Sequence, residues 1–333
     1  MPGVRGDGRP GGVTLATVRM EGRLGTTELV VALRLLRRGR VRELLRSLRR
    51  RRWWFARRLS RPVTLAAYRQ CIDRYNAVQP NRQLLDEIRG YNHTMIEHLN
   101  AVRPVEGMVV LDLGASPHGY ALERALERGV RHYIGVGLDI RGITHVVDDR
   151  GNSGMLLKDD ATALRFPTAM FDVALSISCF EHFTDVDAVL AELARVLKPE
   201  GRALLTLEPV WSCSYGHHLH HFGDCAKLVP PWAHLTWAAD EMRQSLQERW
   251  PGDAPLSLDA AVEWVYSGGA LNRLTVRDFV ERFQKCPLAI EWVVKSKENP
   301  VDLATVERVS RVTGMAVDEL VTTGLSVLLK KAA

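Results

Sequence analysis

The segment VVLDLGASPHG, residues 109–119, constrains the fold of this chain more than any other stretch of its sequence. An apolar run ends near Asp112 and is followed by a turn that contains glycine, after which Tyr120, Leu122 and Leu126 recur at helical spacing. A strand, a tight loop and a helix in this order bring the backbone close to a nucleotide-like ligand. The segment therefore predicts a strand–loop–helix unit of a parallel α/β sheet.

The loop itself indicates what kind of ligand it suits. It reads G-x-S-x-x-G, the spacing of a dinucleotide fingerprint, but Ser116 stands where that fingerprint has its middle glycine. Pro117 also removes a backbone N–H that a pyrophosphate would use. A nucleoside without phosphates therefore fits the loop better than a dinucleotide, which disfavours hydride transfer with NAD.

Further strands follow at the spacing of a doubly wound sheet. A strand predicted for Tyr133–Leu138 leads to Asp139, where a carboxylate can accept hydrogen bonds from both hydroxyls of a ribose. The same aspartate can equally serve as a helix N-cap. Two more strands are predicted for Phe171–Ile177, which leads into a polar stretch, and for Ala203–Leu207.

This succession resembles the class I S-adenosylmethionine-dependent methyltransferases, and most closely their type 11 branch. Residues 105–210 carry the resemblance through five segments in the family's order, VVLDLGASPHG, YIGVGLDI, DDATALRFP, FDVALSISCFEHF and ELARVLKPEGRALL. It implies an α/β fold, a Rossmann-like doubly wound seven-stranded methyltransferase sheet, here with an N-terminal helical extension and C-terminal helical additions. It also implies S-adenosyl-L-methionine as the cofactor.

The resemblance further implies which residues contact that cofactor. Asp112, Gly114 and Ser116 would line its methionine and ribose side. Asp139 would hold the ribose, and the pair Asp160–Ala161 would lie beside the adenine. The full set that we expect at the cofactor is Asp112, Gly114, Ala115, Ser116, Gly119, Asp139, Asp160, Ala161, Ser178 and Cys179.

The acceptor side of the site is predicted from position in the sheet. Ligands of open α/β sheets lie beyond the carboxyl ends of the strands, so residues that follow 171–177 and 203–207 would face the reacting methyl group. Methyl transfer to a hydroxyl needs a group that takes up the hydroxyl proton, and histidine suits this role at neutral pH. The histidines that we predict as candidate bases are His182, His217, His218 and His221.

The same histidines offer ligands for a metal ion. Four histidines within residues 217–221, together with Asp224 and two nearby cysteines, could bind zinc or another divalent ion. The adjacent pairs His217–His218 and His220–His221 do not match the i, i+4 or C-x-x-C spacing of well-specified sites. We therefore predict no metal site, and base catalysis, acceptor contact and structural hydrogen bonding stay open for these side chains.

Composition and spacing divide the chain into four parts. Residues 1–61 are predicted as a disordered, basic amphipathic extension and 62–104 as a helical lid region. Residues 105–210 form the predicted cofactor-binding α/β core. Residues 211–333 are predicted as a substrate-binding insertion and the C-terminal part of the fold.

Apolar spacing predicts secondary structure on both sides of the core. Apolar residues at helical spacing between Leu84 and Leu99 predict a lid helix that packs on the sheet. After the core, residues 259–265, 275–283 and 301–329 are predicted to be helical, and a strand is expected at 289–294.

Positive charge is concentrated in one segment. Residues 31–61 hold 13 arginines and one acid, a net charge of +12 in a chain of net charge +6, so the remainder carries −6. Leucines recur at near-helical spacing among these arginines and two tryptophans follow, as in an interfacial amphipathic helix. Peripheral contact with an anionic membrane and a solvated extension without a partner both stay open. Nucleic acid is disfavoured because no recognisable binding fold accompanies the arginines.

Composition also bounds the class of protein. A hydrophobic content of 46% is that of a globular protein, and no apolar run approaches the roughly 18 residues that a membrane span needs. The five cysteines are scattered and odd in number, which fits reduced thiols better than a disulfide framework. These features predict a cytoplasmic protein, membrane-associated if the arginine segment binds lipid.

The predicted function is S-adenosylmethionine-dependent O-methylation of a saccharide or glycan hydroxyl. The segments WVYSGGALNRL, residues 264–274, and GMAVDELVTTGLSVLLKK, residues 314–331, are similar to methyltransferases of bacterial surface-polysaccharide pathways. That resemblance implies that Asn272 and Arg273 close over the acceptor. The alternatives are a natural-product or lipid O-methyltransferase and, from another class, a non-catalytic cofactor-binding module at a membrane surface.

Overall fold

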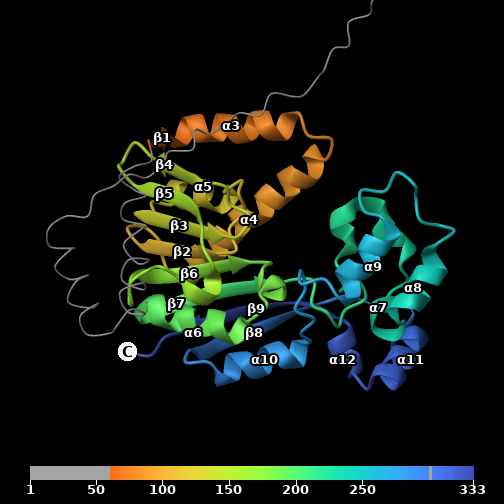
Figure 1. Ribbon diagram of the computed structural model, residues 1–333. Helices are drawn as coiled ribbons and strands as arrows, with labels where there is room; N and C mark the ends of the chain where they lie inside the picture. Colours follow the sequence, from red (N-terminus) through yellow and green to blue (C-terminus); the bar gives the residue numbers. More distant parts are fainter. Residues whose placement is uncertain (1–60, 300–301) are drawn as a thin grey trace, which may run out of the picture. The chain divides into compact units, whose positions relative to one another are not determined.

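Runs of buried valine, leucine and isoleucine form one mixed sheet in the described part of the chain (Figure 1). The computed structural model describes residues 61–299 and 302–333. The strands are β1 (Val63–Thr64), β2 (Val109–Leu113), β3 (His132–Gly137), β4 (Ile143–Val147), β5 (Ser153–Lys158), β6 (Phe171–Ile177), β7 (Leu197–Leu207), β8 (Ala289–Lys297) and β9 (Thr322–Lys330).

Helices precede, connect and follow these strands. The α-helices are α3 (Leu65–Ala77), α4 (Arg82–Val102), α5 (Tyr120–Glu127), α6 (Val186–Val196), α7 (Ala233–Thr236), α8 (Ala239–Leu246), α9 (Leu258–Tyr266), α10 (Val276–Lys285), α11 (Leu303–Thr313) and α12 (Val317–Leu320). Three short 3-10 helices lie in loops, namely η1 (Ala161–Ala163), η2 (Phe180–His182) and η3 (Leu219–Leu228).

The strand order confirms the doubly wound α/β fold. Seven strands lie in the order β5-β3-β2-β6-β7-β9-β8, and β9 runs in the direction opposite to the other six. The chain starts in the middle of this series and moves first to one side and then to the other. This places the loops after β2, β3, β5 and β6 at one carboxyl edge, where such sheets bind their ligands.

The described sheet has nine strands rather than the predicted seven. The two additional strands, β1 and β4, extend the edge beyond β5. β4 pairs antiparallel with β5 because a tight turn joins them, in which the Asp148 carboxylate accepts hydrogen bonds from the backbone N–H groups of Arg150 (3.0 Å) and Asn152 (2.8 Å). This hairpin lies outside the strands that carry the candidate cofactor residues.

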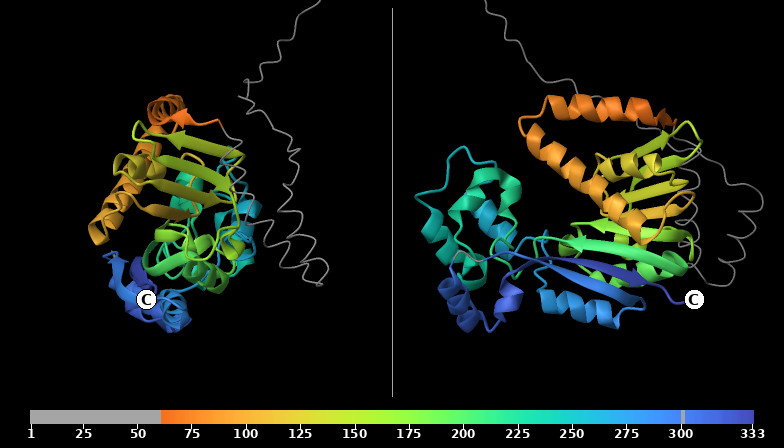
Figure 2. Two further views of the ribbon diagram at one scale, coloured as in Figure 1. Left: turned by 90° about the vertical axis from the view of Figure 1, so that its left-hand side faces the viewer. Right: turned by 180° about the vertical axis from the view of Figure 1, so that it is seen from behind.

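Helices cover both faces of the sheet (Figure 2). Successive residues of β2 point to opposite faces, so Val110 packs with α3, α4 and α5, whereas Leu111 packs with α6 and α10. Helix α4 confirms the helix predicted between Leu84 and Leu99, but only part of its apolar stripe is buried. Leu85, Met95 and Leu99 are buried, whereas Leu84, Ile88 and Tyr91 are exposed. Both faces of the parallel strands are therefore removed from water, as all-parallel sheets require.

A helical segment leaves the sheet after β7 and has an apolar core of its own. Residues of η3, α7, α8 and α9 form this core, among them Met242 and Val262. Trp232 packs instead with α11 and α12, and its indole N–H donates a hydrogen bond to the Leu320 carbonyl at 3.1 Å. The predicted helices at 259–265 and 275–283 are confirmed by α9 and α10, and the strand at 289–294 by β8.

The prediction of helix over residues 301–329 is wrong in its last part, from residue 322 on. Helices α11 and α12 lie within the predicted range, but Thr322–Lys330 form β9, which is hydrogen-bonded between β7 and β8. Seven of its nine residues are buried. A short, fully buried strand and a buried helix have the same continuous apolar pattern, so apolar spacing alone does not separate them.

The arginine-rich extension predicted for residues 1–61 lies outside the described residues except for Arg61. Its proposed contact with an anionic membrane is therefore not addressed by the fold. Among the residues that are described, no helix is long and apolar enough to cross a bilayer.

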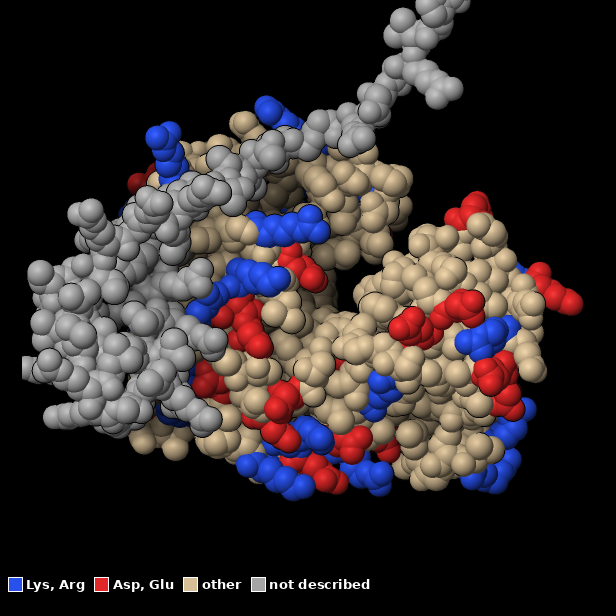
Figure 3. Space-filling view, in the orientation of Figure 1, with Lys and Arg blue, Asp and Glu red and all other residues tan. Residues whose placement is uncertain are grey.

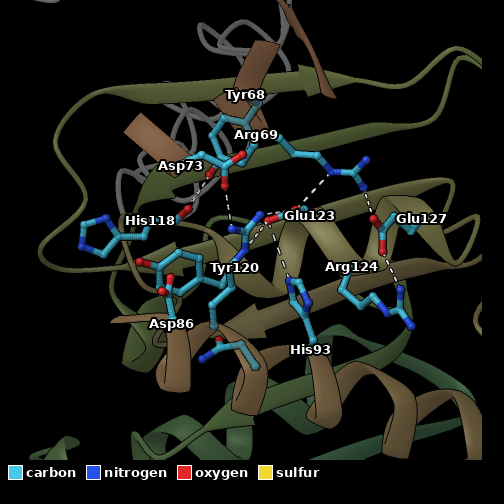
Figure 4. Close-up of polar contacts among 12 residues, drawn as sticks. Tyr68, Arg69, Asp73, Asp86, His93, His118, Tyr120, Glu123, Arg124 and Glu127 are labelled. Carbon is cyan, nitrogen blue, oxygen red and sulfur yellow. Dashed lines mark hydrogen bonds and ion pairs between the residues drawn. The ribbon is translucent and has the colours of Figure 1, made fainter. Parts of the chain in front are cut away.

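A buried carboxylate fastens the lid helices to the core (Figure 4). Glu123 of α5 is 3% exposed and accepts hydrogen bonds from Arg89 of α4 (2.6 Å) and Arg69 of α3 (3.1 Å). His93 Nε2 lies 3.7 Å from the same carboxylate. Burial raises the pKa of Glu123, but His93 and Arg89 outweigh it and lower the value to about 2. The charged form of Glu123 therefore stabilises the packing of α3 and α4.

We predict that Glu123→Gln lowers the free energy of unfolding at pH 7 by about 2 to 3 kcal/mol, because the folded pKa lies below the roughly 4.3 of an unfolded glutamate. The stabilisation by Glu123 is present above the unfolded pKa and is lost as the pH falls towards the folded value of about 2. Denaturant unfolding of both proteins across this range measures the difference.

The matched control is Glu97→Gln, because Glu97 also pairs with two arginines but is more exposed, with 31% of its side chain accessible. The Glu97→Gln substitution should lower the free energy of unfolding by less than about 1 kcal/mol. If the free energies of unfolding of wild type and Glu123→Gln differed by a constant amount down to pH 2, the stabilising role of the Glu123 charge would be contradicted.

Candidate cofactor and acceptor site

The loop after β2 is fastened to the end of β3. The backbone N–H groups of Gly114 and Ala115 both donate to the Val136 carbonyl, at 2.8 and 2.9 Å. Beneath the loop, Asp112 is 4% exposed and accepts a hydrogen bond from the Tyr133 hydroxyl. Burial raises the pKa of Asp112 to about 7 although the Tyr133 hydrogen bond lowers it.

Gly114 brings the loop after β2 against the loop after β6. Its φ of +81° is in the left-handed region, and a Cβ at this position would lie 2.0 Å from Cys179 Sγ. Ser178, which precedes the cysteine, also has a positive φ, of 44°, and its N–H donates to the Thr206 carbonyl of β7 at 2.9 Å. Only glycine therefore fits at position 114, and the two loops share one edge of the sheet.

The lid helix α3 holds the far side of the same loop (Figure 4). The Tyr68 hydroxyl donates to the His118 carbonyl at 2.7 Å, and a Cβ on Gly119 would lie 2.3 Å from that hydroxyl. Ser116 Oγ accepts a hydrogen bond from the His118 N–H at 3.2 Å. The Ser116 hydroxyl thus stabilises the turn, where the usual loop of the family has glycine.

The acidic residues predicted at the cofactor follow neighbouring strands. Asp139 lies two residues beyond β3 and is exposed, so its carboxylate is accessible to a ligand. Asp160 follows β5 and caps η1, where its carboxylate accepts hydrogen bonds from the Thr162 N–H (2.9 Å) and hydroxyl (2.7 Å). Ala161 is buried beside it.

The predicted cofactor residues thus lie along one edge of the sheet. They occur in or directly after β2, β3, β5 and β6, whose carboxyl ends meet there. Burial raises the pKa of the Cys179 thiol, and the carboxyl groups of Glu181, Asp112 and Asp139 raise it further.

The segment after Cys179 carries a buried acid, Glu181. Glu181 is 3% exposed, and burial raises its pKa to about 8. Its Oε2 has no hydrogen-bond partner among the described residues. Asn272 fixes this segment, because its side-chain amide donates to the carbonyls of Phe180 (2.7 Å) and Phe183 (3.1 Å).

Three of the four predicted catalytic histidines converge. One ring nitrogen from each of His182, His218 and His221 lies within 4.8 Å of the others. We call these three residues the histidine triad. His217 is not part of it, since its Nδ1 accepts a hydrogen bond from the Leu219 N–H at 3.0 Å and its ring packs 5.6 Å from that of His234.

Burial keeps the central imidazoles neutral. It lowers the pKa of His218 to about 2 and that of His217 to about 3, with neighbouring histidines acting in the same direction. A neutral imidazole offers a lone pair to a proton or to a metal ion.

Backbone carbonyls orient two members of the triad. His182 Nδ1 lies 2.7 Å from the Ala270 carbonyl, and His218 Nε2 lies 2.9 Å from the Pro209 carbonyl. No sequence signal marks residues 270–272 as the support of η2, because they are distant in the chain. The predicted role of Asn272 over the acceptor is not addressed by these contacts. Figure 3 shows a hollow in the surface between the core and the helical segment that contains α8 and α9.

Comparisons with known proteins agree with this geometry. Residues 111–205 match the Methyltransferase domain family of type 11. An uncharacterized methyltransferase of Mycobacterium sp. strain JLS is 31% identical over 173 residues, which cover 50% of this chain and 63% of that protein. The fatty-acid O-methyltransferase of Mycolicibacterium smegmatis is 31% identical over 122 residues, 36% of this chain and 44% of that protein. The chain thus spans less than two thirds of the length of either relative.

The comparison with solved structures gives a match at low sequence identity and a low TM-score. The S-adenosylmethionine-dependent methyltransferase of Mesorhizobium loti is 17% identical, with a TM-score of 0.43, over 71% of this chain and 96% of that chain. The family match covers the strands and loops from β2 to β7 that hold the predicted cofactor residues. The α/β core of this chain belongs to the class I S-adenosylmethionine-dependent methyltransferases, in their type 11 branch.

Proposed function

We propose that the chain is an S-adenosylmethionine-dependent O-methyltransferase and that its acceptor is a hydroxyl group of a saccharide or glycan intermediate. The observation that carries the proposal is the contact between the two loops at the carboxyl edge, where a Cβ on Gly114 would meet Cys179 Sγ at 2.0 Å. Residues that follow Cys179 in η2 therefore lie beside the predicted cofactor loop. His182 is one of these η2 residues and also a member of the histidine triad.

The residues present fit the proposed cofactor. The exposed Asp139 carboxylate is free to accept hydrogen bonds from ribose hydroxyls, and the buried Glu181 Oε2 has no hydrogen-bond partner among the described residues. Bound S-adenosylmethionine supplies a methyl group on a positively charged sulfur, which an acceptor oxygen can attack in line. The protein's part is to align that oxygen and to help remove its proton.

Neutral imidazoles beside the cofactor loop favour a hydroxyl acceptor. A carboxylic acid is already ionised at neutral pH and needs no proton acceptor, whereas a hydroxyl does. Half-buried Trp211 and Tyr215 belong to the same segment as His218 and His221, and aromatic faces suit the apolar face of a sugar ring. These observations support a saccharide hydroxyl over a simple carboxylate.

The second candidate is methyl transfer to a lipid, and it rests on the similarity to the fatty-acid O-methyltransferase. A lipid acceptor would agree with a membrane-bound arginine segment, whose contact with anionic lipid stays part of this proposal. The two candidates differ in the bond that they form, because a sugar hydroxyl gives a methyl ether and a fatty acid gives a methyl ester.

We predict that Asp139→Ala weakens binding of S-adenosylmethionine by about tenfold or more, because each charge-assisted hydrogen bond to the ribose contributes on the order of 1.5 to 3 kcal/mol. The control is Asp149→Ala. Asp149 is also an exposed aspartate, but it lies in the turn between β4 and β5, away from the carboxyl ends of β3 and β5. Calorimetric titration measures both affinities. Equal affinities in the two variants would contradict the assignment of Asp139, and tighter binding of NAD than of S-adenosylhomocysteine by wild type would contradict the cofactor.

We also predict that the transferred methyl group forms an ether. The purified chain would be incubated with methyl-labelled S-adenosylmethionine and with saccharides, glycan intermediates and fatty acids in parallel. The label should appear on a saccharide and survive mild alkali, because ethers resist hydrolysis under these conditions. Release of the label as methanol would indicate an ester and the lipid candidate. Tight cofactor binding without transfer to any acceptor would support the non-catalytic module.

A further inference from the structure

The histidine triad has the composition of a transition-metal site. Its three ring nitrogens lie within 4.8 Å of one another, and no carboxylate or thiol belongs to the group. The ring centroids of His182 and His218 are 5.2 Å apart, and those of His218 and His221 are 5.9 Å apart. The members come from two distant segments, η2 after β6 and the η3 region after β7, so the fold brings them together.

Hydrogen bonds to backbone carbonyls decide which nitrogens are free. A carbonyl only accepts, so the hydrogen bonds from His182 Nδ1 to Ala270 and from His218 Nε2 to Pro209 place the ring protons on these two atoms. The opposite nitrogens, His182 Nε2 and His218 Nδ1, therefore keep their lone pairs. Histidines that bind metals typically donate their other N–H to a carbonyl or carboxylate in this way.

One of these lone pairs lacks a partner. His218 is 1% exposed, and its Nδ1 makes no hydrogen bond to any of the described residues. An unpaired polar atom in the interior is unfavourable, and a coordinated metal ion would satisfy it.

We propose that His182, His218 and His221 bind one divalent transition-metal ion, of the kind represented by zinc. Imidazole ligands suit zinc and its neighbours, whereas magnesium and calcium prefer oxygen ligands. Three protein ligands leave a fourth position open, as in catalytic zinc sites. Tetrahedral coordination at a Zn–N distance of about 2.0 Å requires nitrogens about 3.3 Å apart. The three ring nitrogens would therefore move closer to one another when the metal binds. The exposed His221 is the member free to make that movement.

The open position would take the acceptor oxygen, a role that rests on the proposed function. A hydroxyl bound to the metal loses its proton to solvent more readily, because the cation stabilises the resulting oxyanion. A lone pair of that oxygen then forms a bond to the methyl carbon, the carbon–sulfur bond of the cofactor breaks, and S-adenosylhomocysteine leaves.

The test is metal binding by the full chain, measured without any acceptor. After treatment with a chelator, the protein would be titrated with Zn²⁺ by calorimetry and its retained metal counted by mass spectrometry. Wild type should bind one equivalent, and His182→Ala, His218→Ala and His221→Ala should each weaken binding by at least about 100-fold. Co²⁺ in place of zinc should give the visible absorption of a tetrahedral site in wild type but not in these three variants.

The control variant is His220→Ala, because His220 is adjacent to His221, with their rings 4.3 Å apart, but lies outside the triad. It should retain the metal. His221→Ala keeps the test interpretable if the buried His218→Ala fails to fold, and binding of S-adenosylhomocysteine reports on the folding of every variant. Absence of stoichiometric zinc in wild type, or equal affinity in His220→Ala and His221→Ala, would overturn the proposal.

Failure of the metal site and failure of the proposed function give different results. Zinc binding by the triad without methyl transfer would support the site and contradict the function. Methyl transfer that is unaffected by chelation would support the function and overturn the role of the metal in it. Activity lost on chelation and restored by zinc or cobalt would support both.

Discussion

The close approach of Gly114 to Cys179 is the constraint on which the rest of the site depends. Strands β2 and β6 are parallel neighbours, so their following loops start at the same edge of the sheet, but only a residue without Cβ lets the loops touch. This contact sets the position of η2 relative to the predicted cofactor loop. Glu181 and His182 lie in η2, directly after Cys179, and so at this same edge of the sheet.

The two sides of the site have different origins. Parallel strands of the core supply the predicted cofactor residues, and the lid helices hold their loop through Tyr68 and the buried Glu123. The segment after β7 supplies His218 and His221, whose positions depend on a left-handed turn at His218, with φ of 57°. Variation in this segment can therefore change the acceptor chemistry without disturbing the cofactor side, as is general for sites placed on a common fold.

Much of the core could be predicted from the sequence because its strands are buried on both faces and bounded by turn residues. The strand at Phe171–Ile177 has the predicted limits, and β2 ends where the first glycine of the loop begins. The predicted helix over residues 322–329 was wrong because a buried strand and a buried helix share one apolar pattern. Position in the sheet placed these histidines beyond the same strand ends, but which of them meet could not be predicted. That depends on the path of η3 and on Asn272, which fixes η2 from a distant part of the chain.

A crystal structure of the chain with bound S-adenosylhomocysteine tests the central claim most directly. The account predicts the ribose hydroxyls within hydrogen-bond distance of Asp139 and the cofactor sulfur facing η2, on the side of His182. A cofactor bound away from the Gly114–Gly119 loop, or with its sulfur directed away from the histidine triad, would contradict it.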